Sequence, residues 1–358
     1  MKIGIVGLPN SGKTTIFNAL THGQIETSAT SSGKLETHLA VVDVPDPRVD
    51  RLSEMFKPRK TIYAQIQFND VAGLQRDTRK SSINGALLAE LSQNDALMQV
   101  VRAFEDESVP HTETTVDPNR DIQILDSEFI LTDLGIVEGR LERLEASAKR
   151  GKSSQNDIAE KELLTRLRAK LEQEIPIRDV ELAKTEDRLI RGFQFMTAKP
   201  ALLVLNAGDN GNDMSEQVQP YAHLHTETLV IQGKLESEIA QMPTGEARVF
   251  LEEFGIQEPG LNKAIRSAYD LLGLLSFFTV GEDEVRAWTI RKGETAVDAA
   301  GTIHSDLARG FIRAEVIGYA DLIACGSMAI ARQRGLLRLE GRDYVVRDGD
   351  ILNIRFNV

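Results

Sequence analysis

The first residues that could do chemistry lie near the N-terminus, in the stretch GLPNSGKT from Gly7 to Thr14. It fits the pattern G-x-x-x-x-G-K-[ST] and lies between an apolar run, KIGIVGL, and a segment with helical spacing, KTTIFNALTH. Backbone N–H groups in such a loop face an anion, and the helix dipole adds to the attraction. We expect Lys13 to bind the β and γ phosphates of a nucleotide. The residues predicted to line this phosphate site are Asn10, Ser11, Gly12, Lys13, Thr14 and Thr15.

A second motif, D-x-x-G, runs from Asp70 to Gly73 after the apolar run IYAQIQF. A carboxylate there can hold Mg²⁺ directly or through water, so Thr14 and Asp70 are the predicted metal ligands. The N–H of Gly73 is predicted to sense the γ-phosphate, as a catalytic contact. Many hydrolases place a glutamine directly after this glycine to orient the attacking water, but here the position is Leu74. The side chain of Leu74 has no hydrogen-bonding group, so the water needs a partner from elsewhere in the chain.

A candidate base site ends the apolar run PALLVLNAGD. GTPases commonly have Asn-Lys-x-Asp here, where the Asp accepts two hydrogen bonds from guanine and the Lys stem covers the ring. In this chain Asn206 and Asp209 are kept and Ala207 replaces the lysine. We predict that Asn206, Ala207 and Asp209 contact the base. These residues alone do not decide between ATP and GTP.

The elements that must position these motifs form an α/β pattern. The runs KIGIVGL, HLAVVDV, TIYAQIQFNDV, DALMQVVRAF and PALLVLNAG predict buried strands, and helical segments separate them. Strands that alternate with helices indicate a parallel sheet covered on both faces. The sequence therefore predicts a P-loop nucleotide-binding domain of the G type over residues 1–275.

A helical insertion is predicted within that domain, over residues 127–197. Apolar residues from Ile130 to Ala148 follow a heptad spacing, and Leu164, Leu167 and Leu171 resume it before Pro176. Asn156 or Asp157 could cap the second helix. We expect an antiparallel helical coiled coil, either a plain packing element or a docking arm.

Residues 276–358 predict a compact β-rich domain. VRAWTI is a predicted strand, AVDAAGTIHSDLARGF a predicted helix, and YVVRDGDILNIRF a predicted hairpin that turns at Asp348 and Gly349. This segment is nearly neutral, whereas the rest of the chain carries most of the formal net charge of −12. An acidic main body argues against broad nucleic-acid binding, so the arginines of the C-terminal segment are the better candidates for touching RNA.

The composition indicates the cellular compartment in which the protein is expected. No apolar run approaches the roughly 18 residues that span a bilayer, and the N-terminus does not resemble a signal peptide. The one cysteine, Cys325, excludes an internal disulfide framework. We expect a cytoplasmic protein without membrane contact, and a monomer rather than an obligate oligomer.

Taken together, several stretches resemble the YchF/Obg-like ATPase family. They are GLPNSGKTT, VPDPRVDRL, NDVAGL, AWTIRKGETAVDAAGTIHSDLARGFIRAEVI and LRLEGRDYVVRDGDILNIRFNV. The resemblance covers nearly the whole chain. It implies a P-loop core of the translation-factor class, a coiled-coil insertion and a C-terminal β-grasp domain of the TGS type. It also implies a preference for ATP over GTP, association with ribosomes and in some cases the proteasome, and a hydrophobic residue in place of the catalytic glutamine, which matches Leu74.

The chain departs from the family pattern at three places. Asp209 stands where the family typically has Glu, which bears on the preference for ATP. The family's switch I threonine falls on Lys34, so Thr30 or Thr37 is the candidate replacement. The phosphate loop has Ser11 and Thr14 where Val and Ser are usual, and Thr14 keeps the hydroxyl that Mg²⁺ needs.

The resemblance also maps a proposed catalytic histidine to His111, in the polar segment EDESVPHTETTVDPNRDIQ. We interpret this segment as a mobile loop. An imidazole can orient or deprotonate water at neutral pH if the loop brings it within reach, and a plain solvated histidine is the alternative. Arg102 and Arg120 are further candidates for offsetting transition-state charge. A K⁺ ion beside Asn10 is a rival to His111.

The sequence thus predicts a slow ATPase that acts as a conformational switch, with Mg²⁺ as cofactor and a ribosomal partner. Two alternatives stay open: a nucleotide-gated binding adaptor whose hydrolysis is incidental, and a GTPase that uses Asp209. A metabolic kinase would need a site for an acceptor substrate, and the sequence offers none.

Overall fold

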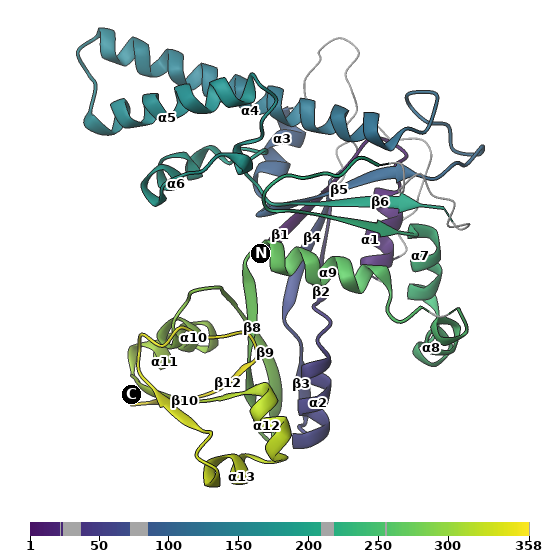
Figure 1. Ribbon diagram of the computed structural model, residues 1–358, viewed down its shortest axis with the longest axis vertical. Helices are drawn as coiled ribbons and strands as arrows, with labels where there is room; N and C mark the ends of the chain where they lie inside the picture. The colour runs from purple at the N-terminus through teal and green to yellow at the C-terminus, as the bar shows by residue number, and fades with distance from the viewer. Residues whose placement is uncertain (22, 24–36, 72–84, 209–217, 255, 358) are drawn as a thin grey trace. The chain divides into compact units, whose positions relative to one another are not determined.

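The computed structural model describes residues 1–21, 23, 37–71, 85–208, 218–254 and 256–357 (Figure 1). The chain divides into two compact units: residues 1–40 with 67–264, called unit 1, and residues 41–66 with 265–358, called unit 2. The sequence predicted one boundary, after residue 275. In the structure, unit 2 also includes residues 41–66, which come from the N-terminal part of the chain. Among the described residues, no helix combines the length and apolar character needed to cross a membrane.

Unit 1 is built on a sheet with the strand order β2-β4-β1-β5-β6-β7. The strands are β1 (Lys2–Val6), β2 (Thr37–Asp43), β4 (Gln65–Val71), β5 (Ala96–Ala103), β6 (Ala201–Ala207) and β7 (Thr226–Ile231). The pairs β1–β4, β1–β5, β5–β6 and β6–β7 are parallel, so the carboxyl ends of these strands meet at one edge. Every residue of β5 and β6 is buried, as continuous apolar runs predict for strands covered on both faces.

Helices cover both faces of this sheet. In Figure 1, α3 (Gly85–Ser92) and α4 (Pro118–Lys149) lie on one side, and α1 (Lys13–Thr21) and α7 (Gly233–Gln241) lie on the other. Leu125 and Phe129 of α4 are fully buried in one core cluster with Leu91 of α3 and Val101 of β5. The helices α8 (Thr244–Glu253) and α9 (Gly260–Leu271) follow α7 along the chain. The predicted α/β architecture of the nucleotide-binding domain is confirmed.

The predicted helical insertion is present, with different ends. The long helix α4 starts at Pro118, because Asp117 caps it and proline suits the first helical position. The prediction that the polar loop extends to Gln123 is therefore wrong from Pro118 onwards. Helix α5 (Gln155–Leu171) starts after its cap, Ser154, so the prediction of Asn156 or Asp157 as the cap is wrong. Asp157 is the third helical residue and forms a capping box with Ser154.

The two long helices run side by side and bury the predicted seam (Figure 1). Val137, Leu141 and Leu144 of α4 share a core cluster with Leu164 and Leu167 of α5. The seam ends earlier than predicted, because Ala148 is exposed. A short helix, α6 (Lys184–Ile190), and the 3₁₀ turns η1 (Ile177–Asp179) and η2 (Arg191–Phe193) lead back to β6.

Unit 2 contains a second sheet, with the strand order β11-β10-β12-β8-β9-β3. The strands are β3 (Lys60–Ile62), β8 (Leu274–Val280), β9 (Glu284–Arg291), β10 (Phe311–Gly318), β11 (Arg338–Glu340) and β12 (Asp350–Phe356). The helices are α2 (Pro47–Phe56), α10 (Ala296–Ile303), α11 (Ser305–Arg309), α12 (Tyr319–Cys325) and α13 (Met328–Gln333). The predicted strand VRAWTI is confirmed as part of β9.

Two local predictions for unit 2 need correction. The predicted single helix from Ala296 is interrupted at His304, whose extended backbone separates α10 from α11. The predicted hairpin keeps its turn at Asp348 and Gly349, but β12 pairs with β10 and β8 rather than with the residues just before the turn. The residue types at Asp348 and Gly349 predicted the turn correctly. The strand pairing could not be predicted locally, because the partners of β12 are distant in the sequence.

Residues 41–66 join unit 2 through specific contacts. Strand β3 pairs in parallel with β9. Arg48 of α2 donates hydrogen bonds to Asp46 and, at 2.6 Å, to Asp348, and its guanidinium lies 5.1 Å from the ring centre of Phe278. Residues 41–66, which lie between the two predicted nucleotide motifs in the sequence, are therefore part of the C-terminal unit.

Candidate functional site

The predicted phosphate loop connects β1 to α1. Gly12 has a φ of 91° and Asn10 a φ of 61°, so both lie in the left-handed region, which glycine tolerates best and asparagine better than most residues. A side chain at Gly7 would place Cβ only 2.3 Å from the carbonyl oxygen of Val100. Gly7 therefore lets the loop pass close to β5, and Gly12 provides the left-handed turn. Thr15 is partly buried in the first turn of α1.

Lys13 and Asp70 form the charged centre of the site. Lys13 is 7% exposed, and its Nζ donates a 2.8 Å hydrogen bond to the carbonyl oxygen of Leu8. Burial lowers the pKa of Lys13 to about 8, and the nearby charge of Asp70 opposes that shift. Burial also raises the pKa of Asp70, against the opposing effects of Lys13, Thr14 and His38. The β1–α1 loop and the end of β4 thus bring together the predicted cation and the predicted metal ligand.

The oxygen atoms near this centre fit a magnesium ion. Thr14 Oγ1 donates a 3.3 Å hydrogen bond to Asp70 Oδ2, so a hydroxyl and a carboxylate lie side by side. Mg²⁺ prefers hard oxygen ligands and binds through one or two carboxylates together with phosphates and water. Ser11 Oγ is buried without a hydrogen-bond partner in the described part of the chain, and a phosphate oxygen could satisfy it.

Asn206 has a role that the sequence did not reveal. Its side-chain nitrogen donates a 3.0 Å hydrogen bond to the carbonyl oxygen of Ser11, and its side-chain oxygen accepts one from the N–H of Gly233. It is 3% exposed at the end of β6, next to the equally buried Ala207. Asn206 therefore joins the phosphate loop to the start of α7. No sequence signal pointed to Gly233, whose contact depends on the fold.

Two predicted site residues, Gly73 and Asp209, lie outside the described residues. The same holds for Leu74, for Thr30 and Lys34, and for the side chain of Thr37. Their assigned roles remain predictions.

The residue before His111 contacts the phosphate loop, but the ring of His111 forms its hydrogen bonds with other residues. Asn10 Nδ2 donates a 3.1 Å hydrogen bond to the carbonyl oxygen of Pro110, the residue before His111. The His111 side chain is only 3% exposed, with Nε2 at 2.8 Å from Asp121 Oδ2. His111 Nδ1 accepts a 3.0 Å hydrogen bond from the N–H of Glu113. The picture of a solvated loop histidine does not fit this geometry.

The two candidate arginines are also engaged. Arg102, 2% exposed on β5, donates hydrogen bonds to the carbonyl oxygens of Phe104, Asp106 and Val109. Arg120 donates to both the carboxylate of Asp121 and the carbonyl oxygen of Thr115. Both arginines therefore hold the 104–117 segment in shape in this structure.

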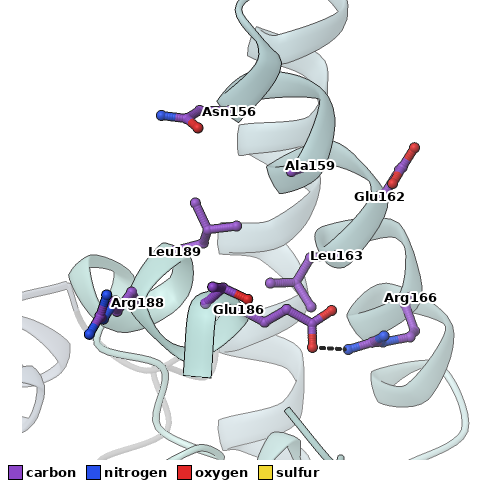
Figure 2. Close-up of a pocket in the computed structure, with 9 residues that line it drawn as sticks. Asn156, Ala159, Glu162, Leu163, Arg166, Glu186, Arg188 and Leu189 are labelled. Carbon is purple, nitrogen blue, oxygen red and sulfur yellow. Dashed lines mark hydrogen bonds and ion pairs between the residues drawn. The ribbon is translucent and has the colours of Figure 1, made fainter. Parts of the chain in front are cut away.

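A separate cavity of about 450 Å³ lies between α5 and α6 (Figure 2). At this cavity, Glu186 of α6 accepts a 3.0 Å hydrogen bond from Arg166 of α5, as Figure 2 shows. The residues that line it all belong to the helical insertion: Asn156, Ala159, Glu162, Leu163, Arg166, Thr185, Glu186, Arg188 and Leu189. This cavity is distinct from the phosphate site.

The lowered pKa of Lys13 gives a pH prediction. Phosphates bind the protonated amine, so ATP affinity should fall as pH rises above about 8, by up to roughly tenfold per pH unit. Protein stability should change in the opposite sense, because the unfolded chain keeps this proton up to the ordinary lysine pKa of 10.5. Isothermal titration from about pH 7 to about pH 9.5 measures the affinity. AMP, which lacks the β and γ phosphates, is the control ligand, and a parallel loss for ATP and AMP would exclude Lys13 as the cause.

Two family models match parts of this chain. Residues 2–116 match the family model MMR_HSR1, described as a 50S ribosome-binding GTPase. Residues 274–357 match the family model YchF-GTPase_C, described as a protein of unknown function.

Full-length relatives are similar along the whole chain. The Ribosome-binding ATPase YchF of Bacillus subtilis is 42% identical over 99% of both chains. The protein of the same name from Escherichia coli O157:H7 is 38% identical over 100% of this chain and 99% of its own. The solved structure of the Schizosaccharomyces pombe YchF GTPase superposes with a TM-score of 0.84 at 32% identity, covering 99% of this chain and 97% of that chain.

Proposed function

This chain belongs to the YchF family, and from that premise we propose that it is a ribosome-associated ATPase that hydrolyses the γ-phosphate slowly and acts as a conformational switch. Nucleotide hydrolysis itself follows from the family and its P-loop domain. The preference for ATP, the low rate, the ribosomal partner, the cytoplasmic location and the monomeric state belong to the proposal. Support for the partner comes from the names of the relatives, which are called ribosome-binding ATPases.

The reaction that we propose is attack of water on the γ-phosphate. Lys13 binds the β and γ phosphates, and the N–H of Gly73 contacts the γ-phosphate. Thr14 and Asp70 would hold Mg²⁺, which offsets the charge that develops on the phosphate oxygens. Leu74 has no group to offer, so we assign the water to His111.

One observation carries the assignment to His111. The hydrogen bond from Asn10 to Pro110 joins the phosphate loop to the residue next to His111. A shift in the phosphate loop on nucleotide binding therefore acts directly on the backbone that carries the histidine. The K⁺ rival uses the same residue, because the side-chain oxygen of Asn10 is the atom that a cation would need.

The engaged ring of His111 supports a second candidate function. With both nitrogens bonded, the histidine does not reach water in this geometry, which favours a nucleotide-gated adaptor with incidental hydrolysis. The adaptor binds its partner according to the nucleotide, and turnover does not change on binding. Measuring both quantities separates the two functions.

Base preference is tested by titrating ATP and GTP into the same preparation. We expect ATP to bind more tightly than GTP. A tenfold preference for GTP, roughly 1.4 kcal/mol, would make the ATP assignment wrong and leave a GTPase that uses Asp209. The Asp209→Glu variant should shift the preference towards ATP if residue 209 contacts the base. Its matched control is Asp179→Glu, an acid in unit 1 that binds His223 and lies outside the predicted base site.

A further inference from the structure

The hydrogen bonds of His111 define its tautomer. The N–H of Glu113 is a donor 3.0 Å from Nδ1, so Nδ1 carries the lone pair and the ring proton lies on Nε2. That proton faces Asp121 Oδ2 at 2.8 Å. His111 is thus a neutral imidazole whose proton is directed at a carboxylate, with Nδ1 as its basic nitrogen.

Asp121 holds a fixed position. It lies in the first turn of α4, with Asp117 as the cap of that helix. Its side chain is 2% exposed, and its other oxygen, Oδ1, accepts hydrogen bonds of 3.0 and 3.2 Å from Arg120. A carboxylate on a long helix, held by an arginine fork, can orient an imidazole better than a loop residue can.

The partner of Nδ1 lies on a weaker element. Glu113 is in a turn closed by a hydrogen bond from the N–H of Thr114 to the carbonyl oxygen of His111. Thr114 has a φ of 66°, a conformation that is strained for a β-branched residue. Opening this turn would release Nδ1 while the bond from Nε2 to Asp121 stays in place.

We propose that Asp121 is the positioning residue for His111 in nucleotide hydrolysis: it fixes the Nε2–H tautomer and leaves Nδ1 as the base, which the Glu113 turn covers until it opens. This inference rests on the proposed role of His111. The contact between Asn10 and Pro110 is the route by which the phosphate loop acts on the turn.

The proton balance of the step is simple. The water oxygen forms a bond to the γ-phosphorus as the bond from that phosphorus to the β–γ bridging oxygen breaks, and ADP leaves with the electron pair. One water proton moves to Nδ1, which gives an imidazolium with protons on both nitrogens. The carboxylate of Asp121 stabilises that cation, and the imidazolium then returns the proton to phosphate or solvent.

The first test is spectroscopic and needs no variant of Asp121. In protein labelled with ¹⁵N-histidine, the ¹⁵N shifts of His111 report which nitrogen is protonated, and the His111→Ala spectrum assigns the signal. We expect protonated Nε2 and unprotonated Nδ1. Protonated Nδ1 in the wild-type protein would overturn the proposal whether or not any variant folds.

The second test is a double-mutant cycle in single-turnover ATP hydrolysis. His111→Ala should lower the rate by about 10²-fold, and Asp121→Asn should lower it by roughly tenfold or more, with ATP affinity unchanged for both. The double variant should be no slower than His111→Ala, because Asp121 acts through the histidine. Asp121→Glu should recover part of the rate. Asp126→Asn is the matched control, since Asp126 lies on the same helix and binds Tyr221 instead.

The outcomes separate this inference from the proposed function. An unchanged rate in His111→Ala removes the histidine from the proposed mechanism, and the inference with it. If His111→Ala hydrolyses ATP slowly and Asp121→Asn has no effect, or an effect that adds to that of His111→Ala, His111 stays in the mechanism. The positioning role of Asp121 is then overturned. A faster Asp121→Asn would show that Asp121 restrains His111 rather than positions it, which also contradicts the proposal.

Discussion

Replacing Lys13 by alanine is expected to lower the rate of ATP hydrolysis by about 10²- to 10³-fold and to weaken ATP binding. The buried amine beside Asp70 is a cation placed where the phosphates are predicted to bind. Such a charge acts strongly because Lys13 is buried, with only 7% of the residue exposed. Steady-state hydrolysis and ATP titration at about pH 7 measure the two effects, since the pKa of about 8 keeps the amine mostly protonated there.

The structure offers a matched control for this variant in Lys199. Lys199 is also 7% exposed, and burial also lowers its pKa, but its Nζ binds the carbonyl oxygens of Ser92 and Asn94. Lys199→Ala should lower stability and leave ATP affinity unchanged. Lys13→Ala should also lose some stability, because it removes the hydrogen bond to the carbonyl oxygen of Leu8, but only this variant should lose ATP affinity and activity. Equal losses of activity in both variants would contradict the assignment of Lys13.

The Asp70→Asn variant is expected to lower turnover by roughly 10²-fold even at saturating Mg²⁺. Asparagine keeps the shape and can still accept the hydrogen bond from Thr14, but it loses the charge that Mg²⁺ requires. It also removes the charge that raises the pKa of Lys13, so less of that amine is protonated at neutral pH. Magnesium titrations of the hydrolysis rate measure the loss of the ligand, and the pH dependence of ATP affinity measures the change at Lys13.

Asp133→Asn is the matched control, because Asp133 is another buried carboxylate in unit 1. It is fully buried, accepts hydrogen bonds from Met196 and Thr197, and has its pKa raised to about 6 by burial. Its loss should affect stability and leave the magnesium dependence as it is. Wild-type turnover in Asp70→Asn at high magnesium would exclude Asp70 as a ligand.

The sequence predicted those features that depend on residues close together in the chain. Buried strands leave apolar runs, and the phosphate loop needs glycine at Gly12, so the sheet and the loop were predictable. Heptad spacing predicted the seam between α4 and α5, because those contacts repeat along two helices. The polar composition of residues 105–123 predicted a loop, but α4 already begins at Pro118, because the Asp117 side chain caps the helix there.

The remaining features depend on contacts between distant residues. Residues 41–66 join unit 2 through the pairing of β3 with β9 and through Arg48 and Asp348, and no local pattern encodes either. Asn206 supports the phosphate loop from β6 in the same way. The pairing of His111 with Asp121 needs both the Glu113 turn and the first turn of α4, so the sequence could propose the histidine without its partner.

The central claim, a ribosome-associated ATPase switch, is tested most directly by the rate of ATP hydrolysis with and without purified ribosomes. We expect low turnover for the protein alone and an increase of roughly tenfold or more with ribosomes, because a partner that repositions the 104–117 segment would release His111. Lys13→Ala, measured in parallel, should show no stimulation. Nucleotide-dependent ribosome binding with an unchanged rate would contradict the switch and establish the adaptor.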